Sequence, residues 1–443
     1  MKKTLTFILA TIMTICLMFC CVACDGGSGG SGNSVASRTD KYGNTLVTIM
    51  VHKDSSTKEG KAYQKCIDNF NEHYKDQKIK AQITFVAQTA GVDQYETTLW
   101  NKLTQGGGAL YDIISFDAPN CARFAQEKLL YDITSLLGDY EKDFIPASVN
   151  KYNDKIYGLP IQESSAGFYY NKAILNNAGV SDAEIADYQR NGWTFNQFKS
   201  VCQKIKVSGK TAVDMQLTAG GETSTYLLYP LGNAAGGEYL SSDGMTANGY
   251  LNSDKTKAGF QFIKDCLNEG YTNYQIGSTD FLAKGTVGMY LSSGWTIPDI
   301  NEQYSATFTG GWGILPYPHA DGNVAVSATG SWSFGLTDNG ITDKSAAMLL
   351  LKWMTSDDSA TIITNATGMI PAKKTIQNSF AELSPEWVLY NQLVTTGKSR
   401  PITVGYGDFS TEFNLILSAL RDQSVSVALN ERTTSLQTKL DRI

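Results

Sequence analysis

Strands and helices alternate in the hydrophobic pattern of the first half of the chain. An apolar run covers 45–52, apolar residues recur at helical spacing over 58–74, and they alternate strictly over 79–87. A helical pattern over 93–105 and a short apolar run over 111–116 complete a β-α-β-α-β order. This order predicts a parallel-type sheet covered by helices on both faces, with ligands expected at the carboxyl ends of its strands.

The same alternation resumes after Pro160 and predicts a second unit. A strand is expected over 167–170 and helices over 195–206 and 255–269, and the chain becomes mostly helical beyond 345. The body from residue 44 to 443 is too long for one ordinary core and long enough for two. The pattern therefore predicts two α/β lobes.

The first 43 residues read as an export signal followed by a tether. Lys2 and Lys3 precede an apolar run over 5–19, which is shorter than the ~20 apolar residues of a membrane span. A Gly/Ser-rich tract then starts at Asp25. We expect a signal peptide over 1–23 and a flexible segment over 24–43.

Cys24 is the expected attachment point of a lipid. Val22-Ala23-Cys24 resembles the lipobox of bacterial lipoproteins, whose cysteine is acylated (palmitate among the chains) and becomes the mature N-terminus. Cys21 departs from the usual leucine of that motif. Anchoring on the extracellular face of the cell membrane is the prediction, and cleavage after Ala23 to give a secreted protein is the alternative.

Charge and motifs exclude several classes of function. The net charge of −6 disfavours nucleic acid and anionic lipid surfaces as partners, which leaves the lipid anchor as the membrane contact. The three histidines have no metal-ligand spacing, and no phosphate-binding glycine loop follows a strand. No catalytic residue, metal or cofactor is predicted.

Four cysteines remain in the mature body: Cys66, Cys121, Cys202 and Cys266. Three of them fall on apolar helical faces, so we expect small buried hydrophobic residues. Disulfides are the alternative, and four cysteines alone do not decide their pairing.

Aromatic residues are abundant, with 23 Tyr, 18 Phe and 7 Trp. Several lie among Gly, Ser and Asp outside any helical or strand stripe, at 292–295, 330–332 and 405–409. A flat ring beside hydroxyl and carboxylate groups suits a sugar, which has an apolar C–H face and a polar edge. Core packing is the alternative for any single ring.

In order and spacing, a series of segments resembles the extracellular solute-binding proteins of ATP-binding-cassette importers, specifically the maltose-binding-protein-like carbohydrate group. They are ALYDIISFDAPN at 109–120, LLYDITSLL at 129–137, DKIYGLP at 154–160, GFYYNKAILNNAGV at 167–180, WTFNQFKSVCQKI at 193–205, GMYLSSGWTIPDI at 288–300, WGILPYP at 312–318, LKWMTSDDSA at 351–360 and GMIPAKK at 368–374.

The resemblance implies a periplasmic-binding-protein-like type II fold, in which two α/β lobes close over a ligand like a hinge. It places the N-terminal lobe at 44–162 plus 324–370 and the C-terminal lobe at 163–318 plus 371–443. It also implies a monomer that delivers a carbohydrate, such as a malto-oligosaccharide, to the permease subunits of an importer.

Sugar contacts carry over where the motifs match. Trp295 and Tyr226 take the positions of stacking aromatics, and Phe116 takes another, with Asp117 beside it as a hydroxyl acceptor. Further contacts are implied at the lobe crossing, in the C-terminal stretch and at the end of the first strand: Glu163, Ser164, Tyr406, Asp408, Phe409, His52, Lys53 and Asp54.

Three other functions stay open from the residues. A glycoside hydrolase also combines sugars, aromatics and two carboxylates. A binding protein of the same fold for a non-sugar such as a phosphate ester should bring convergent arginines, and the matched pocket segments contain none. A surface adhesin predicts no small-molecule cleft.

Overall fold

The computed structural model describes residues 37–88, 92–104, 111–330, 332–376 and 380–443. The expected signal peptide, Cys24 and most of the tether lie outside these residues. Across the described ranges, no helix has the length and apolar character needed to cross a bilayer.

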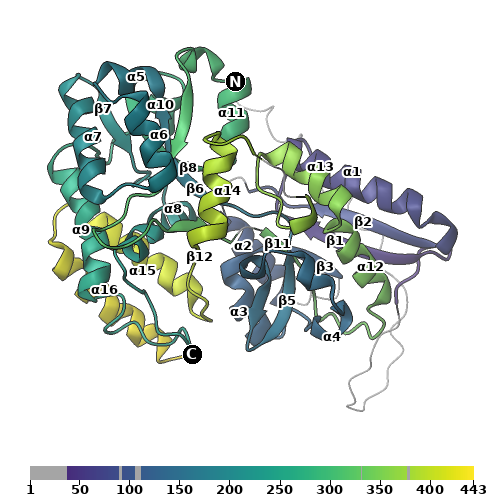
Figure 1. The fold of residues 1–443 in the computed structure, drawn as a ribbon. Coiled ribbons are helices and arrows are strands. Elements are labelled where there is room, and N and C mark those ends of the chain that lie inside the picture. The colour runs from purple at the N-terminus through teal and green to yellow at the C-terminus, as the bar shows by residue number, and fades with distance from the viewer. Residues whose placement is uncertain (1–36, 89–91, 105–110, 331, 377–379) are drawn as a thin grey trace, which may run out of the picture.

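The first body is built on a six-stranded sheet in the order β2-β1-β3-β11-β5-β4 (Figure 1). Its strands are β1 (Thr45–Val51), β2 (Ile79–Phe85), β3 (Ile113–Asp117), β4 (Asn150–Tyr152), β5 (Lys155–Pro160) and β11 (Trp332–Leu336). β1 pairs in parallel with β2 and β3, as the alternating pattern predicts. The prediction of a parallel sheet is wrong for its other half, because β11 comes from late in the chain and pairs antiparallel with both β3 and β5.

Helices cover this sheet on both faces. They are α1 (Lys58–His73), α2 (Val92–Lys102), α3 (Cys121–Gln126), α4 (Thr134–Leu137), α12 (Ser345–Met354) and α13 (Asp357–Thr367). Short 3-10 turns accompany them at Lys75–Gln77, Ala118–Asn120, Tyr140–Asp143, Pro146–Ser148 and Lys374–Ile376. α1 begins where predicted, because the Thr57 side chain accepts from the backbone N–H of Gly60 and caps it.

The second body holds a four-stranded mixed sheet in the order β7-β8-β6-β9. Its strands are β6 (Ala166–Asn171), β7 (Thr211–Asp214), β8 (Val287–Ser293) and β9 (Trp312–Leu315). The helices around it are α5 (Lys172–Asn177), α6 (Asp182–Asn191), α7 (Phe195–Val207), α8 (Gly221–Ala234), α9 (Asp254–Asn268), α10 (Ser278–Leu282), α11 (Thr296–Glu302), α14 (Pro385–Thr396), α15 (Tyr406–Ala419) and α16 (Val425–Leu440), with a 3-10 turn at Ser305–Phe308.

A two-stranded parallel sheet of β10 (Ser327–Thr329) and β12 (Gly397–Ser399) lies near the junction of the bodies. The chain crosses there more than once. At one crossing, Glu163 and Ile370 exchange both backbone hydrogen bonds, at 2.7 and 3.1 Å. The two bodies are therefore joined by paired segments rather than by one loose linker.

The cysteines behave as the apolar pattern predicts. Cys66, Cys121, Cys202 and Cys266 are buried free thiols, and none of these four described residues forms a disulfide. Burial raises the pKa of the Cys66 thiol to about 11, so the group stays neutral and unreactive at neutral pH. The interpretation as small core residues is confirmed.

Asp214, at the end of β7, generates a prediction about stability. Its Oδ1 accepts from the backbone N–H of Gln216 at 2.8 Å, but its Oδ2 is buried without a partner in the described part of the chain. Burial raises the pKa of this carboxyl from 3.8 to about 6. Between these two pH values the folded state binds more protons than the unfolded state, so this group lowers stability as the pH rises.

Asp214→Asn removes the cost of the buried charge. At pH 8 we expect the free energy of unfolding to rise by up to about 3 kcal/mol, and at pH 4 we expect the difference from the parent protein to fall to about 0.5 kcal/mol. Urea unfolding of both proteins at the two pH values measures this difference, with the exposed Asp321→Asn as the control. An equal difference at both pH values would show that desolvation of the charge is not the cause.

Candidate functional site

The two bodies enclose a cleft with two compartments. The Trp295 compartment has a volume of about 410 Å³ and is lined by Lys53, Thr57, Lys58, Glu59, Gln88, Asp117, Gln162, Ser164, Glu222, Thr223, Tyr226, Trp295, Gly330, Trp332, Ala366, Thr367, Met369 and Arg400. The α15 compartment has about 650 Å³ and is lined by Glu96, Thr97, Trp100, Asp117, Asn120, Arg123, Phe124, Gly221, Glu222, Tyr406, Gly407, Ser410, Thr411, Asn414, Leu415 and Ser418. Both volumes are typical of small-molecule sites.

Strand ends place the polar groups of the first body in the cleft. Lys53 follows β1, Gln88 follows β2, and Asp117 is the last residue of β3. Because these strands are parallel, their carboxyl ends meet at one edge of the sheet. Lys53 is held there by Glu59, with 3.2 Å between Nζ and Oε2.

Arg400 crosses the cleft between the compartments. β10 and β12 pair in parallel with Thr329 opposite Ser399, so the next residues, Gly330 and Arg400, lie side by side. The Arg400 guanidinium donates to both oxygens of Asp117, at 2.8 and 2.7 Å, to the Gly330 carbonyl at 2.7 Å, and to Glu222 of α8. We call Arg400, Asp117 and Glu222 the Arg400 bridge.

The Arg400 bridge is buried, and it holds more negative than positive charge. The side chains of Arg400, Asp117 and Glu222 are 3, 6 and 7% exposed. Burial alone lowers the pKa of Arg400, but its surrounding groups, Asp117 first among them and Glu222 and Tyr406 with it, together outweigh burial, and the pKa lies well above its usual range. Glu96 lies behind Asp117, and burial together with the Asp117 charge raises the pKa of Glu96 well above its usual range. A negative charge on Glu96 is therefore disfavoured.

Aromatic rings from both bodies line the Trp295 compartment, with Trp295 and Tyr226 on the second body and Trp332 on the first. Trp295 is 40% exposed, and its ring centroid lies 5.9 Å from that of Tyr226. Trp332 stacks on the buried His52 at 3.6 Å with an interplanar angle of 5°. Burial lowers the pKa of His52 to about 4, so the ring behind Trp332 is neutral at neutral pH. The compartment thus combines flat apolar faces with hydrogen-bonding groups.

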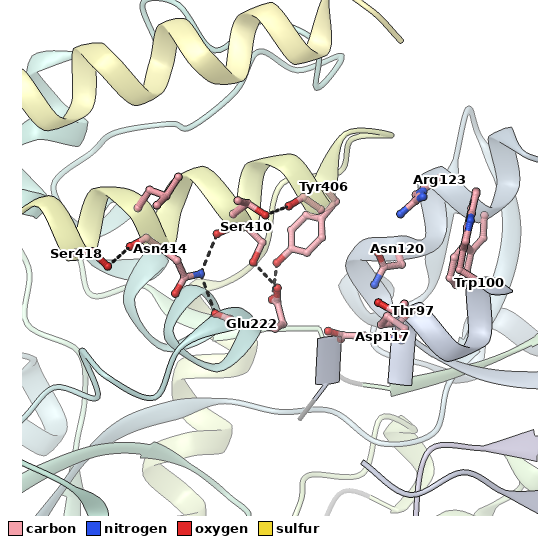
Figure 2. Close-up of a pocket in the computed structure, with 16 residues that line it drawn as sticks. Thr97, Trp100, Asp117, Asn120, Arg123, Glu222, Tyr406, Ser410, Asn414 and Ser418 are labelled. Atoms are coloured by element: carbon pink, nitrogen blue, oxygen red, sulfur yellow. Dashed lines mark hydrogen bonds between the residues drawn. The ribbon is translucent and has the colours of Figure 1, made fainter. Parts of the chain in front are cut away.

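The α15 compartment faces a different set of polar side chains (Figure 2). Tyr406 and Ser410 of α15 both donate to the Glu222 carboxylate, and Asn414 donates to the Ser410 carbonyl at 2.8 Å. Thr97, Trp100, Asn120 and Arg123 lie across from them on the first body, and the Arg123 guanidinium stacks 3.8 Å from the Trp100 ring centre.

Five of the residues expected in the site lie together in the Trp295 compartment: Lys53, Asp117, Ser164, Tyr226 and Trp295. Tyr226 donates its hydroxyl to Ser164 at 2.7 Å. Tyr406 lines the α15 compartment on the other side of the Arg400 bridge. Of the first-strand residues, Lys53 faces the cleft, and His52 lies buried behind Trp332.

Phe116 and Phe409 lie in the core rather than on the cleft wall. Both rings are fully buried. The Phe116 ring occupies space that glycines leave open, since a Cβ at Gly158 or Gly335 would lie 2.6 or 2.9 Å from it. Phe116 precedes Asp117 in a strand, where successive side chains point to opposite faces, so the two cannot both face the ligand.

Three carboxylates expected in the site lie outside both linings in the described structure. Glu163 is buried at the crossing, where it accepts from the Ser148 hydroxyl, from the Ser164 N–H at 2.8 Å and from the Gly330 N–H at 2.9 Å. Asp408 pairs with Lys439 at 3.3 Å, and the exposed Asp54 accepts from the N–H of Ser56 at 2.8 Å. Each of these carboxylates already has a hydrogen-bond or ion-pair partner within the protein.

Sequence reasoning missed Arg400, Glu222 and Trp332. The matched segments contain no arginine, and Arg400 reaches the cleft from a segment that those motifs do not cover. Trp332 belongs to a Gly-Ser-Trp stretch already notable in the sequence, and that signal could have placed it. The carboxylate of Glu222 carries no sequence pattern of its own.

Known proteins match this chain in sequence and in fold. The family profile described as "Bacterial extracellular solute-binding protein" matches residues 65–392. The arabinooligosaccharide-binding protein of Bacillus subtilis is 24% identical over 274 residues, which cover 61% of this chain and 55% of that relative. The chain therefore spans only about half the length of that relative.

Two solved structures show the same architecture. The cyclic α-maltosyl-1,6-maltose binding protein from Arthrobacter globiformis has a TM-score of 0.74 at 20% identity, with 90% of this chain and 100% of that chain covered. The GacH receptor of Streptomyces glaucescens has a TM-score of 0.72 at 18% identity, with 89% and 98% covered. These likenesses establish the fold expected from the sequence, a type II periplasmic-binding fold with mixed sheets. By the profile match over most of its length, this chain belongs to the bacterial extracellular solute-binding protein family.

Proposed function

We propose that this protein captures an oligosaccharide outside the cell and delivers it to the permease of an ATP-binding-cassette importer. One observation carries the proposal: the partly exposed Trp295 ring, with Tyr226 and Trp332, shares a compartment with Asp117, Ser164 and Gln162. The rings suit the C–H faces of sugar units, and the oxygens and amides suit their hydroxyls.

The charges of the cleft favour a neutral ligand over a phosphate ester. In the Trp295 compartment, Arg400 is the arginine that would attract an anion, but it is already paired with Asp117 and Glu222. Lys53 is likewise paired with Glu59, and Lys58 with Glu302. An incoming phosphate would meet more buried carboxylates than free cations.

Known ligands of related proteins support the same class. The curated relative is named for arabino-oligosaccharides, and the two structural relatives are described with a cyclic maltose derivative and with acarbose. These ligands differ in sugar and linkage, so they support carbohydrate as the class without naming one sugar. Delivery to a permease follows from the resemblance to importer-associated binding proteins.

A thermal-shift screen against mono- and oligosaccharides tests the proposal. A ligand at a hundredfold excess over its Kd stabilises the folded state by ~2.7 kcal/mol. Product analysis after long incubation separates binding from the hydrolase alternative, and we expect only unchanged oligosaccharide. A screen without any shift would favour the adhesin alternative, and a shift with phosphate esters alone would favour a non-sugar binding protein.

Trp295→Ala should weaken sugar binding without unfolding the protein. We expect a loss of ~2 kcal/mol, or ~30-fold in Kd by calorimetry, because the variant removes a broad apolar face from the compartment. Since Trp295 is 40% exposed, the melting temperature should change little. Tyr42→Ala, which removes a ring that is 70% exposed and outside the lining, is the control. An unchanged Kd with a large fall in melting temperature would make Trp295 a core residue.

Ligand should draw the two bodies together. A sugar that contacts Asp117 on one body and Trp295 on the other gains both contacts only in the closed arrangement, so it favours that arrangement. Cysteines introduced at the exposed positions Lys61 of α1 and Asn301 of α11 allow selective spin labelling, because the described native cysteines are buried. We expect a shorter and narrower distance distribution with saturating sugar. The same distribution with and without a ligand from the thermal screen would argue against closure.

Cys24 is proposed to hold the protein at the membrane. Two acyl chains give firm anchoring where one is marginal, so Cys24→Ala should move the protein from the membrane fraction to the medium. Immunoblots of the two fractions measure this, with Cys16→Ala, upstream of the lipobox, as the matched control that keeps the acylated thiol. Parent protein found wholly in the medium would favour plain secretion.

A further inference from the structure

A group of buried side chains separates the two compartments of the cleft and forms a wall between them. Asp117 and Glu222 line both compartments, and Arg400 joins the two carboxylates. Asp117 ends β3 in the first body, whereas Glu222 lies in the first turn of α8 in the second. The Arg400 bridge therefore runs from one body to the other across the full width of the cleft.

Further hydrogen bonds hold this wall, the Arg400 bridge, in place. On the α15 side, Tyr406 and Ser410 donate to Glu222 (Figure 2). The Gly330 carbonyl, in the crossing segment, accepts a hydrogen bond from Arg400 at 2.7 Å. Charge-assisted bonds of this number in a buried site resist displacement, because a sugar hydroxyl can bond to each ion but does not supply the opposite charge. With the Arg400 bridge in place, a sugar chain cannot pass from one compartment to the other.

The Arg400 bridge also offers contacts to a sugar that stops against it. The Nε–H of Arg400 is buried without a partner in the described part of the chain, and Arg400 lines the Trp295 compartment. A carboxylate has about four acceptor sites, and the Asp117 oxygens use only some of them for Arg400. One donor and spare acceptors thus meet where the terminal unit of a chain would lie.

We propose that the Arg400 bridge is a chain-end stop: the Trp295 compartment takes a short oligosaccharide whose terminal unit abuts Asp117, Arg400 and Glu222, and no unit extends beyond it. This inference rests on the proposed function and adds to it the part of the ligand that is recognised. The protein selects a chain by its end and by its length.

Calorimetry with a homologous series of the oligosaccharide found in the thermal screen tests the length limit. Affinity should rise with chain length and then level off, with each further unit changing the Kd by less than about threefold, below the contribution of one hydrogen bond. Two forms of the same oligosaccharide, each carrying a bulky fluorophore at a different end, test which end of the chain abuts the Arg400 bridge. One tagged form should lose measurable binding and the other should keep it.

The double variant Glu222→Ala, Arg400→Ala opens the wall. It removes one charge of each sign and leaves Asp117 facing a widened, water-accessible passage. In this variant the longer oligosaccharides should bind more tightly than the short ones. Their Kd should fall by about fivefold or more for each added unit that reaches the α15 compartment. Glu238→Gln, together with Lys398→Met, removes an exposed ion pair of the second body and is the matched control.

Several outcomes would overturn the chain-end stop. They are a steady rise in affinity with length in the parent protein, equal tolerance of tags at both ends, or a folded double variant with the parent's length profile. If the double variant does not fold, the two tagged oligosaccharides decide with the parent protein alone. Absence of binding by every oligosaccharide would instead overturn the proposed function, and the chain-end stop with it.

Discussion

The cleft depends on one buried guanidinium. Arg400 pairs with Asp117 of the first body and with Glu222 of the second, so a single side chain joins the two bodies across the cleft. Removing such ions from water costs several kcal/mol each, and only close, multiple hydrogen bonds repay the cost. The bidentate pairing with Asp117 and the bond to the Gly330 carbonyl supply them. Burial and the Asp117 charge raise the pKa of Glu96, so a further negative charge in the same space is disfavoured.

The arrangement of strands explains why this charge lies where it does. Parallel pairing of β1, β2 and β3 brings three strand ends to one edge, and parallel pairing of β10 with β12 brings Arg400 beside Gly330. Trp332 begins β11 directly opposite Asp117, which sets an aromatic face next to the carboxylate. The polar wall and the aromatic platform thus come from backbone pairing, and the side chains add the chemistry.

Local pattern was enough to predict much of the fold, because α1 and β2 each bury one face and show it as periodicity in the sequence, and β1 shows its burial as a continuous apolar run. The burial of Cys66, Cys202 and Cys266 followed from the same periodicity. The antiparallel entry of β11 could not be predicted this way, since it depends on pairing between residues more than 200 positions apart. Arg400 was missed for the same reason: a charged residue in a short loop becomes a site residue only when distant carboxylates surround it.

The site residues show the limit of carrying positions over by motif. Phe116 and Asp117 are neighbours in sequence, yet the strand turns one to the core and the other to the cleft. Glu163 lies beside the cleft residue Ser164, but its carboxylate satisfies the N–H groups of the crossing segments instead of a ligand. A motif match locates a segment to within a residue or two, whereas a contact requires the correct face of it.

Gly330 links the crossing segments to the Arg400 bridge. Its φ of 92° lies in the region that glycine tolerates, and in this conformation its N–H donates to Glu163 while its carbonyl accepts from Arg400. One peptide segment therefore connects the buried carboxylate at the joint of the two bodies with the guanidinium that spans the cleft. A movement that separates Asp117 from Arg400 therefore changes the electrostatic environment of Gly330. Gly330 is itself hydrogen-bonded to Glu163, the residue at the crossing between the two bodies. The position of the bodies and the state of the bridge are for this reason coupled through a few short bonds, without a long relay of side chains.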